Sequence, residues 1–118
     1  MDNNIIAEKT VAFAIRIVKC SKYLQYEKNE YIMSKQLLRC GTSIGANIHE
    51  SIFAQSKADF ISKLSISLKE ASEASYWLTI LNQTDYIDEH IFKSFKKDID
   101  EIIRIIISAI KTAKKNTE

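Results

Sequence analysis

The sequence predicts an all-α protein, an up-down-up-down antiparallel four-helix bundle. Three observations lead to this fold class. Apolar residues recur at helical spacing in four successive segments, no segment alternates with a period of two, and the chain has no proline. Helices are expected at about residues 5–25, 30–53, 57–82 and 89–114. Short connections join them into a single four-helix-bundle domain over residues 1–118.

The first two helices are defined by their apolar stripes. Residues that share one face of the first helix are Ile6, Phe13, Ile17, Cys20 and Leu24. A polar stretch at residues 26–29 separates them from the stripe of the second helix, Leu37, Gly41, Ile44, Ile48 and Ile52. Each stripe is expected to face the core.

Capping signals mark the starts of the third and fourth helices. Ser56 and Asp59 have the spacing of a capping box, Asp88 is an expected N-cap, and Ile87 and Phe92 can form a hydrophobic staple across it. The third core stripe is Phe60, Leu64, Leu68, Ala71, Ala74, Leu78 and Leu81. The fourth is Ile91, Phe95, Ile99, Ile102, Ile106, Ile110 and Ala113.

Composition narrows the function classes. A chain of 118 residues can bury a core without disulfides, and a formal charge of +2 does not by itself indicate a polyanion partner. The N-terminus lacks the pattern of a signal peptide, and no apolar run is long enough for a membrane span, so a soluble cytoplasmic protein is expected. Cys20 and Cys40 are isolated, which favours reduced thiols packed as small hydrophobic groups.

Both glycines of the chain lie in the second helix. Gly41 and Gly45 fall within its core-facing sector, where glycine costs about 0.5–1 kcal/mol relative to alanine. A compensating gain is therefore expected. It is either the close approach of a neighbouring helix or room for a large side chain such as Phe13 or Trp77. The spacing fits no phosphate-binding loop.

A polar seam flanks this glycine-containing stripe. It comprises Gln36, Arg39, Ser43, Asn47 and Glu50, and it is expected to be half-buried beside the core. Glu70 and Glu73 of the third helix are the expected partners of Arg39, because arginine pairs with carboxylates in a bidentate geometry. A structural network of these groups is the favoured interpretation, with a ligand site as the alternative.

Catalytic and metal-binding patterns are weak. Ser43 and His49 lie on one helix about 120° apart, too far round for a nucleophile and its base. Neither histidine has the glutamate three residues earlier that a di-iron bundle requires. No enzymatic activity, metal or cofactor is expected.

The first and third helices carry more apolar surface than one core needs. The surplus residues are Val11, Ile15, Val18, Ile66, Trp77 and Ile80. Exposed apolar patches of this kind usually mark association, so these six are candidates for a homo-oligomer interface. The alternative is that they fill a wide core.

The fourth helix has a basic stripe opposite its isoleucines, formed by Lys93, Lys97, Arg104, Lys111 and Lys115. Such a stripe is commonly the solvated side of an amphipathic helix. Repeated around a ring of subunits, it could hold RNA or DNA through phosphates without reading sequence.

The middle of the chain resembles a known family. Residues 36–81 closely resemble the four-helix-bundle proteins named for the intervening sequences of bacterial 23S rRNA genes. The motif positions that match are Arg39, Ser43, Ile44, Asn47, Glu50, Ser56, Phe60 and Glu73. Ser51 stands where the family often has glycine.

The resemblance implies a four-helix protomer that assembles into a ring-shaped homopentamer. The chain is similar also to the accessory variability proteins of diversity-generating retroelements, which share that assembly and bind nucleic acid and a reverse transcriptase. The expected function is a non-enzymatic oligomeric protein that binds RNA or DNA through its basic outer face. The alternative is a protein-binding scaffold or adaptor with no nucleic-acid role.

Overall fold

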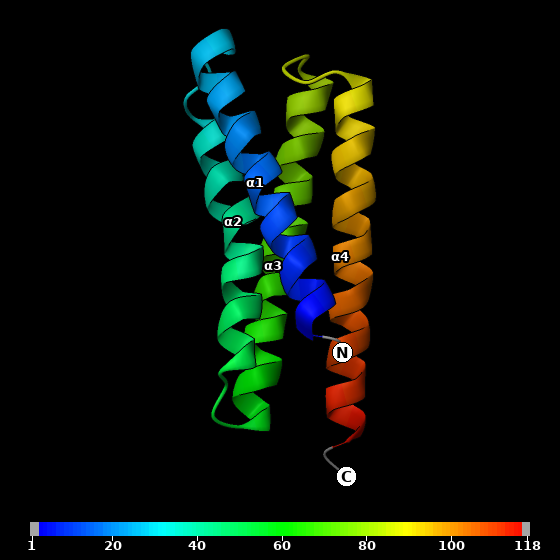
Figure 1. The fold of residues 1–118 in the computed structure, drawn as a ribbon. Helices are drawn as coiled ribbons and strands as arrows, with labels where there is room; N and C mark the ends of the chain where they lie inside the picture. Colours follow the sequence, from blue (N-terminus) through cyan, green and yellow to red (C-terminus); the bar gives the residue numbers. More distant parts are fainter. Residues whose placement is uncertain (1–2, 117–118) are drawn as a thin grey trace.

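The computed structural model describes residues 3–116 as four α-helices. These are α1 (Asn3–Lys28), α2 (Met33–Ile52), α3 (Lys57–Gln83) and α4 (Glu89–Lys115). The bundle measures 51 × 22 × 20 Å, and the described part of the chain contains no strand. The connection between α2 and α3 lies at one end of the bundle, and the other two connections lie at the opposite end (Figure 1).

A buried carboxylate sets the start of α2. Glu30 accepts hydrogen bonds from the backbone N–H groups of Ile32, Met33 and Ser34, the last at 2.8 Å. These are the free donors of a helix N-terminus, and a negative charge there also complements the helix dipole. The helix therefore begins at Met33, three residues after the predicted position, because Glu30 caps it from outside.

The caps of α3 and α4 use the residues that the sequence indicates. The Ser56 hydroxyl accepts from the Asp59 N–H at 3.0 Å, and the Asp88 carboxylate accepts from the Ile91 N–H at 2.8 Å. Asp59 in turn accepts from the Gln55 N–H, so the capping box closes one residue before the N-cap. Each of these bonds satisfies an otherwise unpaired donor near the start of a helix.

The core lies between the four stripes. Consecutive helices pack along most of their lengths, whereas α1 and α4 approach one another over a shorter stretch (Figure 1). Several of the predicted core residues are less buried than expected. Ile52 is exposed because α2 ends there. Those that are only half-buried at the edge of the core are Phe60, Leu68, Ile91 and Ile110.

The two glycines allow α1 and α2 to pack closely. A Cβ at Gly41 would lie 2.8 Å from both Cγ atoms of Ile17, and a Cβ at Gly45 would lie 3.2 Å from Cβ and Oγ1 of Thr10. Close helix approach is thus the gain that offsets the glycine cost. The side chains that occupy this space are Ile17 and Thr10; Phe13 and Trp77, the residues named from the sequence, are not those nearest the glycines.

Candidate interaction surfaces

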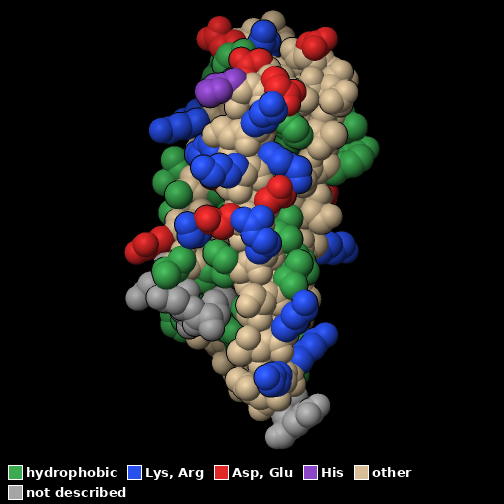
Figure 2. Space-filling view, turned by 90° about the vertical axis from the view of Figure 1, so that its right-hand side faces the viewer, with side chains coloured by type: hydrophobic (Ala, Val, Ile, Leu, Met, Phe, Trp, Pro, Cys, Tyr) green, Lys and Arg blue, Asp and Glu red, His purple; other side chains and the backbone are tan. Residues whose placement is uncertain are grey.

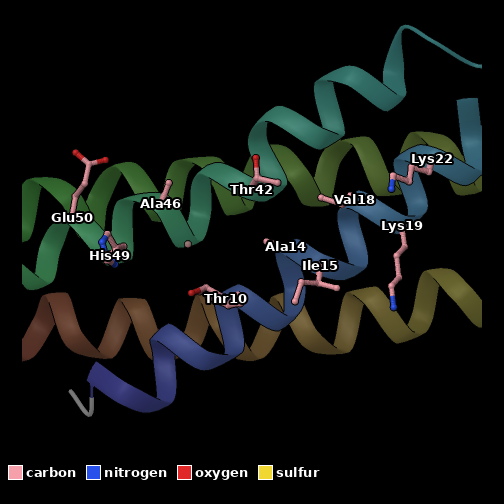
Figure 3. A pocket seen from close by; sticks show the side chains of 12 residues that line it. Thr10, Ala14, Ile15, Val18, Lys19, Lys22, Thr42, Ala46, His49 and Glu50 are labelled. Carbon is pink, nitrogen blue, oxygen red and sulfur yellow. The ribbon is translucent and has the colours of Figure 1, made fainter.

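A groove with a volume of about 730 Å³ lies between α1 and α2. Its floor is apolar, and Figure 3 shows Ala14, Ile15 and Val18 along its middle. Val11 and Ile15 are 57% and 51% exposed. The residues that line it are Thr10, Val11, Ala14, Ile15, Val18, Lys19, Lys22, Thr42, Gly45, Ala46, His49 and Glu50.

The groove exists because small residues face it from both helices. Ala14, Gly45 and Ala46 leave space above the helix contact, and the Thr10 hydroxyl turns back to donate to the Ile6 and Ala7 carbonyls. The two ends of the groove differ in charge. Lys19 and Lys22 lie toward the α1–α2 connection, whereas His49 and Glu50 lie at the other end (Figure 3).

The apolar residues of α3 divide between the core and the surface. Ile66 is exposed, whereas Trp77 and Ile80 are half-buried. Trp77 packs against the core and meets Tyr76 edge to face at 5.1 Å, so part of the expected second apolar face is used inside the subunit. The backbones of α1 and α3 do not approach one another within residues 3–116. Their exposed apolar groups therefore form two separate patches.

The polar seam is two bridges rather than one continuous network. Arg39 donates to Glu70 at 3.1 Å and to Glu73, and Glu50 pairs with Lys63 at 3.2 Å. These contacts tie α2 to α3. The Asn47 amide instead donates to the Ser43 carbonyl of its own helix.

Exposure within the seam also differs from expectation. Ser43 and Asn47 are half-buried, but Gln36, Arg39 and Glu50 are exposed. The bridges therefore lie at the rim of the α2–α3 contact, where ion pairs contribute little to stability and help to define helix register.

The Arg39 bridge changes the ionisation of its partners. The hydrogen bond from Arg39 lowers the pKa of the Glu73 carboxyl, and the neighbouring Trp77 indole contributes to the same shift. The Trp77 Nε1–H is buried and makes no hydrogen bond of normal geometry among the described residues. Because the pKa of Glu73 is lowered in the folded state, the ionised carboxylate stabilises the fold at pH values above the ordinary glutamate pKa. This contribution is lost as the pH falls through the lowered value.

The five residues of the basic stripe are all exposed on α4. Acidic groups accompany its first half. Glu89 lies 3.9 Å from Lys93, and the pKa of Glu101 is lowered chiefly by Lys9, with smaller effects from Arg104 and Lys97. Residues 102–115 contain no acidic residue. Figure 2 shows this change along α4, with mixed charges in the upper part and basic groups alone near the lower end of the helix.

Basic side chains of α1 form ion pairs with some of the acidic side chains of α4. The sequence did not indicate these contacts. Arg16 pairs with Asp98, donates to the Ser94 hydroxyl at 2.8 Å and lies 4.1 Å from the centre of the Phe95 ring. Lys9 pairs with Glu101 at 2.7 Å. Arg16 and Asp98 are 82 positions apart in the chain, so no local pattern signals such a pair.

Neither a clustered metal site nor an activated thiol is found among the described residues. Within residues 3–116, no three His, Cys, Asp or Glu side chains come together as a metal site. Cys20 and Cys40 are free and buried, and burial raises their pKa values to about 11 and about 12. Neither thiol is therefore activated as a nucleophile at neutral pH. None of the helices in this part of the chain combines the length and apolar character needed to cross a bilayer.

Known proteins share both the sequence pattern and the fold. The family model described as 23S rRNA-intervening sequence protein matches residues 2–108. A crystal structure of a protein of unknown function from the S23 ribosomal protein family of Bacteroides thetaiotaomicron VPI-5482 is 51% identical, with a TM-score of 0.92. The alignment covers 94% of this chain and 99% of that one. No curated protein matches significantly. The chain belongs to the 23S rRNA-intervening sequence protein family.

Proposed function

We propose that the protein is a non-enzymatic, cytoplasmic assembly protein whose up-down-up-down bundles associate as a ring-shaped homopentamer. The observation that carries this proposal is the apolar groove between α1 and α2. Val11, Ile15 and Val18 are exposed there and contribute nothing to the core of the subunit. An exposed, concave apolar surface of this size is typical of an association site.

The positions of the two apolar patches favour a head-to-tail interface. A groove is not complementary to a second copy of itself, so it needs a convex partner surface. We assign the partner surface to α3 around Ile66, because Ile66 is exposed and lies on a different side of the bundle from α1. Contacts between two different patches are heterologous, and they form a ring when the rotation between subunits closes. A ring of five subunits is the assembly that the resemblance to the accessory variability proteins implies.

The mass of the protein in solution tests the assembly. Light scattering coupled to size exclusion is expected to show a discrete species of five chains at micromolar concentration, each chain being 13.5 kDa. A monodisperse 13.5 kDa species would refute self-association. A series of species of increasing mass would contradict a closed ring.

The basic half of α4 favours nucleic-acid binding as a second function of the same assembly. Lys111 and Lys115 are exposed along a stretch without acidic neighbours on the helix, and the exposed Arg104 lies one turn after Glu101 at the start of this stretch. Arg16 and Lys9 meanwhile engage Asp98 and Glu101, which weakens the opposing negative charge. Phosphate contacts from such a surface would bind RNA or DNA without reading base sequence.

A mobility-shift titration with a structured RNA at two salt concentrations tests this surface. Changing Lys93, Lys97, Arg104 and Lys111 together to glutamine is expected to weaken binding and to flatten its salt dependence, with the slope falling by about one for each phosphate that is no longer neutralised. A control with Lys63→Gln and Lys69→Gln removes charge from α3 and should keep the affinity. If the α4 variant binds RNA as the unmodified protein does, the surface is wrong, and a protein-binding scaffold becomes the better interpretation.

A further inference from the structure

Three of the five tyrosines of the chain are exposed at one end of the bundle, where α1 passes into α2. Tyr26 is 75% exposed, Tyr31 is 49% exposed and Tyr23 is 41% exposed. Tyr23 and Tyr26 are one helical turn apart near the end of α1, and Tyr31 precedes α2. None of the three belongs to the core cluster, so the fold of the subunit does not account for them.

Four lysines lie in the same segment of the chain as these rings. Lys19, Lys22, Lys28 and Lys35 are all exposed, and no ion pair engages them within residues 3–116. The Lys28 ammonium lies 5.8 Å from the centre of the Tyr23 ring. We call this surface the tyrosine–lysine end; it comprises Lys19, Lys22, Tyr23, Tyr26, Lys28, Tyr31 and Lys35.

The acidic residues of this segment do little to cancel the lysines. Glu30 is buried, and its carboxylate accepts three backbone hydrogen bonds at the start of α2. Glu27 is the acidic residue that remains exposed between positions 19 and 35. Four ammonium groups therefore face solvent against one carboxylate, beside three exposed aromatic rings.

We propose that the tyrosine–lysine end binds single-stranded nucleic acid. Lysines that follow the phosphate backbone, together with exposed rings on which bases stack, are the two components of sequence-tolerant single-strand binding. Tyr23 and Tyr26 have Cβ atoms about 5–6 Å apart on the helix surface, so one strand can meet both rings. A duplex cannot use this surface in the same way, because its bases are already paired and stacked.

This site is independent of the basic stripe on α4. Stacking needs rings, and the outward face that holds the α4 stripe carries lysines and an arginine without exposed tyrosines. Lys19 and Lys22 line the end of the groove nearest the α1–α2 connection (Figure 3). The three tyrosines, Lys28 and Lys35 are not among the residues that line the groove, so a second subunit in the groove leaves the rings accessible. Single-strand binding at the tyrosine–lysine end can therefore be tested separately from duplex or structured-RNA binding by α4.

Fluorescence anisotropy with a labelled 15-nucleotide oligouridine RNA tests the proposal. The full chain carrying Tyr26→Ala and Tyr31→Ala is expected to bind about tenfold more weakly or worse, because each ring that stacks on a base supplies a substantial part of the affinity. Tyr26→Phe with Tyr31→Phe should retain the affinity, since phenylalanine keeps the stacking face. Tyr26→Leu with Tyr31→Leu should bind as weakly as the alanine variant, although leucine keeps a large apolar side chain.

Two controls separate stacking from other effects. Phe53→Ala removes a ring that is 71% exposed at the opposite end of the bundle, and it should leave oligouridine binding unchanged. Tyr76→Ala, which removes an exposed tyrosine from α3, should leave oligouridine binding unchanged as well. Equal affinity of the alanine variant and the unmodified protein would overturn the proposal, as would leucine substituting fully for tyrosine. The latter result would identify the surface as an apolar docking site for a protein.

Discussion

Replacing Gly41 with alanine is expected to lower the free energy of unfolding by about 1–2 kcal/mol, although alanine is the better helix former. The propensity gain is about 1 kcal/mol at most, whereas overpacking a core costs about 1–3 kcal/mol. Overpacking wins here because the new Cβ would lie 2.8 Å from two γ-carbons of Ile17, which is fully buried. Ile17 can yield only if α1 moves away from α2. Urea unfolding at a fixed protein concentration measures the change.

A double-mutant cycle identifies Ile17 as the cause. In an Ile17→Ala background the atoms that clash are absent, so Gly41→Ala should become neutral or stabilising. Gly45→Ala provides a graded comparison, because its Cβ would meet Thr10 at 3.2 Å and should cost less. Equal destabilisation by Gly41→Ala in both backgrounds would show that the α1–α2 approach is not what requires glycine.

Ile15→Glu is expected to convert the oligomer into a folded monomer. Ile15 is half exposed on the floor of the groove, so glutamate there is tolerated in an isolated subunit. Burying that carboxylate against an apolar partner would leave a desolvated, unpaired charge at the interface. Light scattering would then give a mass of 13.5 kDa, with helical circular dichroism unchanged.

Mixing two variants distinguishes a head-to-tail interface from a symmetric one. Ile66→Glu should also give monomers, because it places a charge on the proposed partner face of α3 and leaves the groove intact. Each variant keeps the face that the other lacks, so an equimolar mixture should form a two-chain species that cannot grow. Ser72→Glu, an exposed change elsewhere on α3, should assemble normally. A symmetric groove-to-groove dimer would instead survive Ile66→Glu, and the mixture would contain no new species.

The residues of the helix cores and caps can be predicted from local pattern. The positions of Ile44 and Ile48 on α2, or Ile99 and Ile102 on α4, follow from a repeat of 3.6 residues and the need to bury apolar area. The caps at Ser56 and Asp88 depend on donors only three residues away. The same kind of pattern places the start of α2 three residues too early. A glutamate that precedes a helix can either extend the helix or cap it. The burial of Glu30 and its hydrogen bond from the Ser34 N–H show that here the glutamate caps α2.

The interaction surfaces are predicted less completely, since they depend on which helices become neighbours. Charge and side-chain geometry pair Arg39 with Glu70 and Glu73, and the structure places the three together. The Arg16 contacts with Phe95 and Asp98 have no such signal, because they join the first and last helices. Trp77 illustrates the reverse case: its helical position indicates an outward face, but its ring packs at the edge of the core.

The all-α class, the four helices and their core faces are properties of the sequence alone, because periodicity, capping and propensity act within about 20 residues. How close α1 and α2 come is a tertiary property, and it sets both the role of Gly41 and the depth of the groove. Which charged side chains are engaged and which remain exposed is also a tertiary property. The burial of Glu30 beside the lysines of the tyrosine–lysine end is an example. Distances between helices and the pairing of distant side chains depend on packing over the whole bundle, which no local pattern specifies.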